Sequence, residues 1–287
     1  MTTTGRPSAH DQSACASPSP SLSPSPSGFV CVSCGAAVAQ LVRDYGKGNV
    51  RLAICGACNA VADPYVEYDN VLLFLEVMLL KPQVYRHVLY NLSPPPRSRA
   101  ILKLFFILVM LDMNVKAYLI DRRAGVAFRS ESMFERDEGR EISGLRISQY
   151  SLHLVGASFL ENVAFVGALL AAIALDPLAR GWRAQLTRGA ASRSAALVRF
   201  GTAVCVSSFG KLFALLTVIW EFHWTFVHVI GAIVLCSNAL ALRLLLHEPA
   251  PAPAVLLLLL AALAARAATQ LALYYSVGDS ALFFVLV

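Results

Sequence analysis

Four cysteines near the beginning of the chain have the residue type and spacing of a metal site. They form two Cys-x-x-Cys pairs, Cys31 with Cys34 and Cys55 with Cys58. One such turn can place two thiolates on an ion, and two turns complete the tetrahedral sulfur shell that Zn²⁺ accepts. We therefore predict a structural zinc site, because four sulfur ligands leave no open position for a catalytic water. Redox-active thiols and chance spacing are the alternatives.

The residues between the two pairs predict the element that holds them. The sequence GKGN, 46–49, is typical of a hairpin turn and separates two strand-like runs, 40–45 and 50–54. Gly35 and Asn59 each follow the second cysteine of a pair and suit a left-handed backbone. The pattern predicts a zinc ribbon, in which the metal would contribute on the order of 10 kcal/mol to folding.

Alternating acidic and aromatic residues follow the ribbon in the sequence DPYVEYD, 63–69. In an extended chain alternate residues lie on the same face, so these side chains would form one polar surface. We interpret it as a docking site for a lipid headgroup or a protein partner, and a solvated strand edge is the alternative. The candidate residues are Asp63, Tyr65, Glu67 and Asp69.

A second candidate docking site lies in the sequence QVYRHVLYN, 83–91, which we predict to be a helix along the membrane surface. Arginine binds phosphate with a forked pair of hydrogen bonds, and tyrosine favours the membrane interface. The segment would then face lipid headgroups, and a surface helix with ordinary anchors is the alternative. The candidate residues are Tyr85, Arg86, His87 and Asn91.

The rest of the chain has the composition of a membrane protein. Of its 287 residues, 57% are hydrophobic and 15% are charged, and the mean hydropathy is +0.60. Apolar stretches of about 20 residues are long enough to cross a bilayer as helices. The sequence predicts an α-helical multi-pass domain with five spans, or four if the weakest, 100–120, is left out. The five are 100–120, 150–175, 197–220, 224–246 and 254–275.

Charged residues interrupt these apolar stretches. Because charges inside a membrane are costly, they favour a functional interior. Asp112 and Lys116 are four residues apart and can pair on one helix face, and we predict an interhelical pair between Glu161 and Arg266. Pairing for assembly alone, or snorkelling of Lys and Arg to the interface, is the alternative. The intramembrane set is Asp112, Lys116, Glu161, Lys211 and Arg266.

The chain divides into four parts by composition. Residues 1–28 are a Ser/Pro-rich tail that we expect to be disordered, and residues 29–70 are the zinc ribbon. Residues 71–99 are predicted interfacial helices, and residues 100–287 form the transmembrane domain. The loop 176–196 contains four Arg and one acid. By the positive-inside rule this loop, and with it the ribbon, is expected to be cytoplasmic.

Two classes of function are not indicated. The net charge of +6 is not gathered in a basic tract, so nucleic acid is not an expected partner. The sequence has no Gly-rich phosphate loop, no serine nucleophile motif and no paired catalytic carboxylates. Glu221, His223 and His228 do not have the spacing His-Glu-x-x-His. We therefore expect that the protein is not an enzyme.

The segment from Phe29 to Asn91 resembles the N-terminal homology domain of the Arv family, which are multi-pass proteins of the endoplasmic reticulum. The zinc spacing, the acidic-aromatic stretch and YRHVLYN, 85–91, occur in the family's order, and SSFGKLFALLTVIWEF, 207–222, resembles its C-terminal membrane region. The resemblance implies that the four cysteines are metal ligands and that both docking sets belong to the family pattern. Pro64 departs from that pattern, which usually has a basic residue there.

The resemblance also implies a function, that of a mediator of sterol homeostasis. Such a protein aids transport and distribution of sterols and other lipids from the endoplasmic reticulum and affects sphingolipid metabolism. A non-transporting scaffold for glycosylphosphatidylinositol-anchor or other lipid biosynthetic enzymes is the alternative. A third hypothesis, a membrane-embedded lipid-modifying enzyme, rests on His153, Glu161 and the buried charges.

The expected partners are membrane lipids, either sterol or glycolipid, and subunits of such biosynthetic enzymes. The expected location is the endoplasmic reticulum membrane, with the Golgi as a second location. Under the docking hypothesis, Asp63→Ala and Glu67→Ala would impair sterol distribution without loss of zinc.

Overall fold

The structure, a computed structural model, describes residues 28–46, 49–123, 141–175, 184, 190–213, 225–246 and 252–277. The predicted disordered tail lies outside these residues, apart from Gly28. So do Glu221, His223 and most of the loop 176–196, on which the predicted orientation rests. The cytoplasmic placement of the ribbon therefore stays a prediction.

The N-terminal module consists of two small antiparallel hairpins. Strand β1 (Phe29–Val30) pairs with β2 (Ala37–Val38), and β3 (Val42–Asp44) pairs with β4 (Val50–Leu52). The second pair confirms the hairpin predicted around residues 46–49. The core of the module consists of only a few residues. Leu41, Ala53 and Ala62 are buried, and the partly buried side chains packed against them are Phe29, Val38 and Val42. So small a core makes a metal the expected source of stability.

The chain leaves the ribbon through η1, a 3-10 helix at Pro64–Glu67. Asp63 caps this helix, because its Oδ1 accepts a hydrogen bond from the Tyr65 backbone N–H at 3.0 Å. A proline at the first position favours the turn further. The prediction of an extended chain here is wrong, and the polar residues do not share a face. Asp63 and Tyr65 are buried, whereas Glu67 and Asp69 are exposed.

Helix α1 (Asn70–Met78) is a short apolar helix, as predicted for the residues after the ribbon. Its Val77 is buried, whereas Val71 and Leu75 are 68% and 51% exposed. Phe74 contacts the ring of Phe209 from the helical domain, with the ring centroids 6.2 Å apart. An apolar face left exposed beside membrane helices is typical of a segment that lies in the membrane interface.

Helix α2 (Pro82–Arg86) continues directly into η2 (His87–Asn91), which has π-helical hydrogen bonding. The prediction that this segment lies along the surface is wrong. Val84, Tyr85 and Leu89 are buried in the main hydrophobic core. The segment can be buried because its polar side chains form hydrogen bonds with other parts of the protein.

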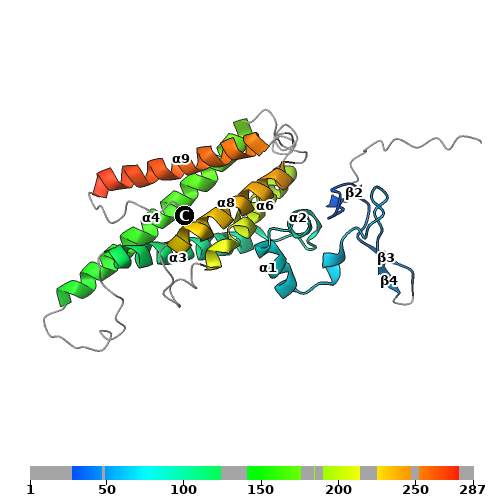
Figure 1. The fold of residues 1–287 in the computed structure, drawn as a ribbon, viewed down its shortest axis with the longest axis horizontal. Helices are drawn as coiled ribbons and strands as arrows, with labels where there is room; N and C mark the ends of the chain where they lie inside the picture. Colours follow the sequence, from blue (N-terminus) through cyan, green and yellow to red (C-terminus); the bar gives the residue numbers. More distant parts are fainter. Residues whose placement is uncertain are drawn as a thin grey trace, which may run out of the picture.

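In the described part of the chain, the membrane domain contains five long helices. Helix α4 packs on α9 and α6 packs on α8, while α3 packs on α4 and α6. Figure 1 shows the ribbon at one end of this bundle, joined to it through α1 and α2. Their bounds are α3 Ser98–Arg123, α4 Glu141–Leu175, α6 Ala190–Ser207, α8 Thr225–Leu245 and α9 Ala252–Val277, with a 3-10 turn η5, Phe209–Leu212, after α6.

Four segments in the described part of the chain are long and apolar enough to cross a membrane. They are 153–175, 192–212, 228–245 and 252–276. This is the lower of the two predicted numbers of spans. Helix α3 has sufficient length for a span, but Lys103, Asp112 and Lys116 interrupt it.

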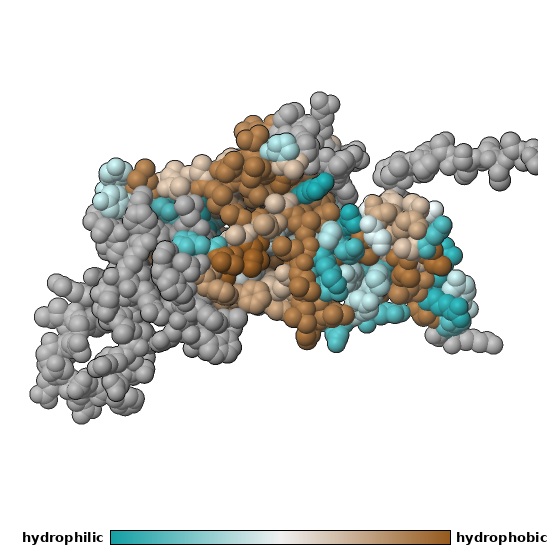
Figure 2. Space-filling view, in the orientation of Figure 1, coloured by the Kyte–Doolittle hydropathy of each residue, from teal (hydrophilic) through white to brown (hydrophobic). Residues whose placement is uncertain are grey.

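The helical domain has apolar side chains on its surface and polar ones inside. Leu257 in α9 is 66% exposed and Phe106 in α3 is 55% exposed, whereas Glu161 in α4 is 1% exposed. Hydrophobic side chains cover most of this domain in Figure 2, and hydrophilic ones gather near the ribbon. This distribution is expected for helices surrounded by lipid, since charged residues there face the bundle interior.

Two glycines allow close helix packing of the kind common in membranes. A Cβ atom at Gly201 would lie 2.9 Å from Ile101 Cγ2, and one at Gly210 would lie 3.0 Å from Val234 Cγ2. Gly201 therefore brings α6 against α3, and Gly210 brings η5 against α8. The second contact positions the neighbouring Lys211.

Candidate metal centre and its attachment to the membrane domain

The two cysteine pairs are held by nearly identical backbone turns. In the first turn the Gly35 N–H donates to the Cys31 carbonyl at 2.8 Å, and in the second the Asn59 N–H donates to the Cys55 carbonyl at 3.0 Å. Gly35 and Asn59 have φ angles of 79° and 57°. The left-handed backbone predicted at both positions is confirmed.

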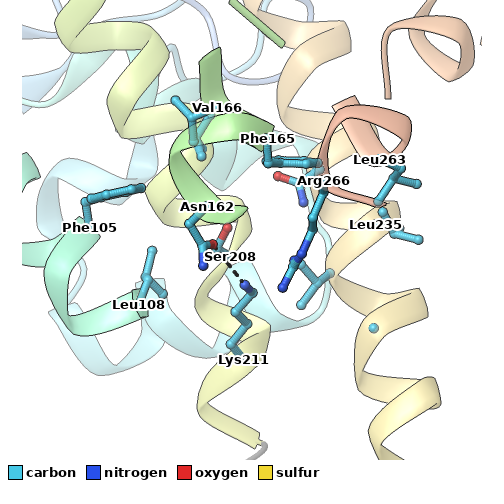
Figure 3. A pocket seen from close by; sticks show the side chains of 14 residues that line it. Phe105, Leu108, Asn162, Phe165, Val166, Ser208, Lys211, Leu235, Leu263 and Arg266 are labelled. Carbon is cyan, nitrogen blue, oxygen red and sulfur yellow. Dashed lines mark hydrogen bonds between the residues drawn. The ribbon is translucent and has the colours of Figure 1, made fainter. Parts of the chain in front are cut away.

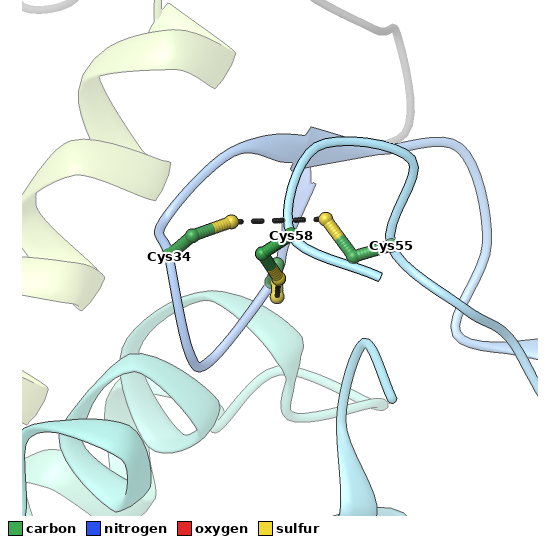
Figure 4. A group of neighbouring side chains, drawn as sticks. Cys34, Cys55 and Cys58 are labelled. Carbon is green, nitrogen blue, oxygen red and sulfur yellow. Dashed lines mark hydrogen bonds between the residues drawn. The ribbon is translucent and has the colours of Figure 1, made fainter. Parts of the chain in front are cut away.

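The four thiols lie close together. All four sulfur atoms lie within 4.8 Å of one another, and the Cys31–Cys58 and Cys34–Cys55 sulfur distances are both 3.7 Å (Figure 4). A tetrahedral ion with sulfur bonds of about 2.3 Å requires sulfur atoms about 3.8 Å apart, whereas a disulfide requires about 2.05 Å. The residues fit a tetrahedral metal ion with a closed shell.

The sites of the four thiols differ in how strongly they favour the negatively charged thiolate. Burial raises the pKa of Cys34 to about 12. Burial also opposes ionisation of Cys55, but hydrogen bonds from the Ala57 and Cys58 backbone N–H groups outweigh it and lower the pKa of Cys55 to about 7. Because a metal binds thiolates, its binding must release protons and must weaken as the pH falls.

Arg86 from α2 closes the first cysteine turn from the side of the membrane domain. Its Nη1 donates to the Val32 carbonyl at 2.6 Å and to the Ser33 carbonyl at 2.9 Å. Gly35 lies beside this side chain, since a Cβ atom there would be in ordinary contact with Arg86 Nε at 3.7 Å. The half-buried guanidinium therefore binds the backbone between two ligand cysteines.

Asp63 is the centre of a buried polar cluster that joins the ribbon to η2. Its Oδ2 lies 2.7 Å from His87 Nδ1 and accepts a hydrogen bond from Asn91 Nδ2 at 2.6 Å. Asn91 also binds both backbone groups of Val30, at 2.9 Å and 2.8 Å. Val30 precedes Cys31, so this cluster fixes the first cysteine turn against η2. None of these three residues is more than 5% exposed.

Asp63→Ala is expected to destabilise the joint by about 3 kcal/mol, because two buried donors would lose their acceptor. Limited proteolysis of the purified protein should then cleave faster between the ribbon and α3. Asp69→Ala is the matched control, since Asp69 is exposed. Equal protease resistance of the Asp63→Ala and wild-type proteins would contradict this role and leave the docking hypothesis for Asp63 in place.

Two tyrosines attach the same segment to α8. Tyr85 Oη lies 2.5 Å from Ser237 Oγ and donates to the Val77 carbonyl at 3.2 Å. Tyr90 Oη donates to the Leu244 carbonyl at 2.9 Å, near the end of α8. The α2–η2 segment therefore binds the ribbon through Arg86, His87 and Asn91 and binds the membrane domain through its tyrosines.

The structure divides the predicted docking residues into two groups. Six of the eight bind other parts of the protein, and only Glu67 and Asp69 present exposed carboxylates. Tyr65 Oη donates to Glu76 Oε2 at 2.5 Å, and Glu76 also pairs with Lys81 at 2.7 Å. Burial raises the pKa of Tyr65, and the hydrogen bond from Lys81 holds the pKa of Glu76 below its usual value. The six inward residues are Asp63, Tyr65, Tyr85, Arg86, His87 and Asn91.

The five predicted intramembrane charges form one buried cluster, and Asp112 in α3 is its first centre. Its Oδ1 accepts from Lys211 Nζ at 3.1 Å, and its Oδ2 accepts from Arg266 Nη2 at 3.0 Å and from Asn162 Nδ2 at 3.0 Å. Lys116 Nζ lies 3.4 Å away, which is the predicted pair within α3. One carboxylate thereby joins α3, α4, η5 and α9.

Glu161 in α4 is the second centre of the cluster. Arg266 Nε donates to its Oε2 at 3.3 Å, so the interhelical pair predicted from the sequence is present. Gln270 Nε2 donates to the same oxygen at 3.0 Å. Lys116 Nζ lies 2.7 Å from it, although it has no hydrogen-bond geometry to any described residue. All five charged side chains are at least nine-tenths buried.

Sequence reasoning missed several polar residues that complete these sites. Asn162 and Gln270 satisfy the two buried carboxylates, Ser237 meets Tyr85, and Glu76 binds Tyr65. The first two were detectable, because each lies on an otherwise apolar helix within one turn of a predicted buried charge. Nothing in the local sequence marks Ser237.

Comparison with known proteins supports one family. The model of the Arv1-like family matches residues 30–242. The protein named ARV 1 from Arabidopsis thaliana is 29% identical over 218 residues, which cover 75% of this chain and 77% of that protein. The Schizosaccharomyces pombe protein arv1 is 30% identical, with 75% and 74% of the two chains covered.

A shorter and closer similarity is found to the ARV1 protein of Eremothecium gossypii. It is 47% identical over 63 residues, which cover 22% of this chain and 21% of that protein. No solved structure gives a significant match. With a family model that covers most of the chain, and with a closed four-cysteine centre joined to membrane helices, the protein belongs to the Arv1-like family.

Proposed function

We propose that this protein aids the transport and distribution of sterols and other lipids from the endoplasmic reticulum membrane, with linked effects on sphingolipid metabolism. Membership of the Arv1-like family supports a role in sterol and lipid homeostasis. We further propose that the metal is Zn²⁺, that the ribbon is cytoplasmic, where thiols stay reduced, and that the protein acts without an enzymatic step.

The joint between the ribbon and the membrane domain is the observation that carries this proposal. Buried contacts of His87 and Asn91, together with the part-buried contact of Arg86, hold the ribbon, and the exposed apolar face of α1 lies beside it. A ribbon fixed in this way has little reach away from the membrane. Its lipid partners must therefore come to the membrane surface or to the bundle itself.

Sterol transfer between vesicles tests the proposal directly. The purified full-length protein is reconstituted into donor vesicles that contain labelled sterol, and the arrival of label in acceptor vesicles is measured over time. We expect transfer several-fold faster than from protein-free vesicles. The acceleration should be lost in Cys55→Ser and kept in Cys236→Ser, which makes the same change at an exposed cysteine of α8. Transfer at the protein-free rate by the folded wild-type protein would refute a transport function.

One exposed strip favours the alternative, a scaffold for lipid biosynthetic enzymes. Val66 and Tyr68 are each 44% exposed and Val71 is 68% exposed, and the carboxylates of Glu67 and Asp69 lie among them. Apolar and aromatic residues with a charged rim are typical of protein interfaces. A stable complex with an enzyme subunit that is lost in Tyr68→Ala, with no sterol transfer, would support this alternative.

A further inference from the structure

The buried cluster of the membrane domain contains more positive than negative charge. Lys116, Lys211 and Arg266 face two carboxylates, those of Asp112 and Glu161. No other acidic side chain in the described part of the chain contacts these cations. Among the described residues one positive charge is thus left in excess, and an unbalanced buried charge costs several kcal/mol. An anion at this place would remove the imbalance.

Two of the three cations line a cavity of about 40 Å³. Figure 3 shows Lys211 and Arg266 converging on it from η5 and α9, with Asn162 hydrogen-bonded to Lys211 at 3.5 Å. By the usual measure such a volume holds about three water molecules, or a group of similar size. The other polar lining residues are Ser208 and Asn238, and no carboxylate lines the cavity.

Lys211 and Arg266 each have an N–H donor that no described residue accepts. An arginine has five N–H donors and a lysine three. Arg266 uses Nε and Nη2 toward Glu161 and Asp112, and its Nη1 binds no described residue. Lys211 binds Asp112 and Asn162, which leaves one of its three donors. A tetrahedral oxyanion is the group that such a forked and a point donor recognise together.

We propose that this cavity binds a singly charged phosphate group, held in the membrane as the phosphodiester of an anionic lipid. One negative charge balances the cluster, and the size of the cavity suits a phosphate. The remaining lining is apolar, with Phe105, Leu108 and Leu263 among it, so the site lies between membrane helices, where phosphate is carried by lipids. The site is separate from the metal ribbon and does not depend on sterol transport.

The test uses the full-length protein in a neutral detergent. Its thermal midpoint is measured with added phosphatidylglycerol, phosphatidylcholine or inorganic phosphate. We expect phosphatidylglycerol alone to raise the midpoint by several degrees, because only it combines a net negative charge with a lipid chain. A rise with inorganic phosphate alone would overturn the lipid source and assign the site to the free ion. Equal midpoints in all three would overturn the anion site itself.

Lys211→Met is the variant that tests the anion site most directly. It removes the excess charge and leaves Arg266 paired with Asp112 and Glu161, so the protein should fold without the anion. Its apparent affinity for phosphatidylglycerol should fall at least tenfold, whereas Lys103→Met, at an exposed position of α3, should keep the wild-type affinity. Wild-type affinity in Lys211→Met would overturn the proposal.

Native mass spectrometry of the wild-type protein decides the question if Lys211→Met does not accumulate. One phosphatidylglycerol molecule retained at a collision energy that removes phosphatidylcholine would support the site. Loss of both lipids at the same energy would overturn it.

Discussion

Cys55→Ser is expected to remove the bound metal and to unfold the ribbon. The four sulfur atoms lie within 4.8 Å of one another, so each is one corner of a shell that a serine oxygen cannot complete with the same affinity. The remaining core is small, and a structural zinc contributes on the order of 10 kcal/mol to such modules. Metal analysis of the purified protein should give close to one zinc per wild-type chain and close to none per variant chain.

Cys236→Ser is the matched control for this experiment. It makes the same atomic change at an exposed cysteine of α8, away from the cluster, and should keep both the metal and the protease resistance of the ribbon. A wild-type protein that is folded and contains no metal would refute the metal centre. In that case the four thiols would have to be reconsidered as a redox site.

Asp112→Asn is expected to have the second largest effect. Asp112 accepts hydrogen bonds from Lys211, Arg266 and Asn162, and it is 2% exposed. Asparagine keeps the shape but removes the charge, so three buried cations would face one carboxylate. Breaking a buried ion pair in this way costs about 3–5 kcal/mol, a large part of the usual stability of a protein. The variant should accumulate poorly or unfold at a much lower temperature in detergent.

A double variant shows whether charge is the cause. Asp112→Asn combined with Lys211→Met restores the original excess of one positive charge, and should recover part of the lost stability. Lys103→Gln, which removes an exposed charge from the same helix, should leave the thermal midpoint unchanged. An Asp112→Asn protein as stable as the wild type would mean that the cluster contributes nothing to folding.

The four-cysteine site was predictable because residues close together in the sequence determine its geometry. Each Cys-x-x-Cys turn is set by neighbouring residues, and the left-handed positions of Gly35 and Asn59 follow from their types. The membrane helices were predictable for a similar reason, since length and hydropathy are properties of a continuous stretch. The number of spans could not be fixed from the sequence, because charged residues interrupt α3. Only the packing shows that two of them, Asp112 and Lys116, face inward.

The predicted exposure of six docking residues was wrong, because burial of a polar side chain depends on distant partners. Asp63 meets His87 and Asn91, which lie more than twenty residues later in the chain. Exposed and buried acids look alike in a sequence, and the alternation of 63–69 suggested a surface. One local signal pointed the other way, since an aspartate directly before a proline is typical of a helix start.

The α2–η2 segment gives the molecule a mechanical property. Its residues alternate in attachment, with Arg86 and Asn91 on the ribbon and Tyr85 and Tyr90 on α8, so it acts as a rigid strut between them. A shift of α8 must then move or strain the first cysteine turn. Thermodynamic linkage makes such coupling reciprocal. Any ligand that changes the position of α8 will change the metal affinity of the ribbon, and metal loading will change the affinity for that ligand by the same factor.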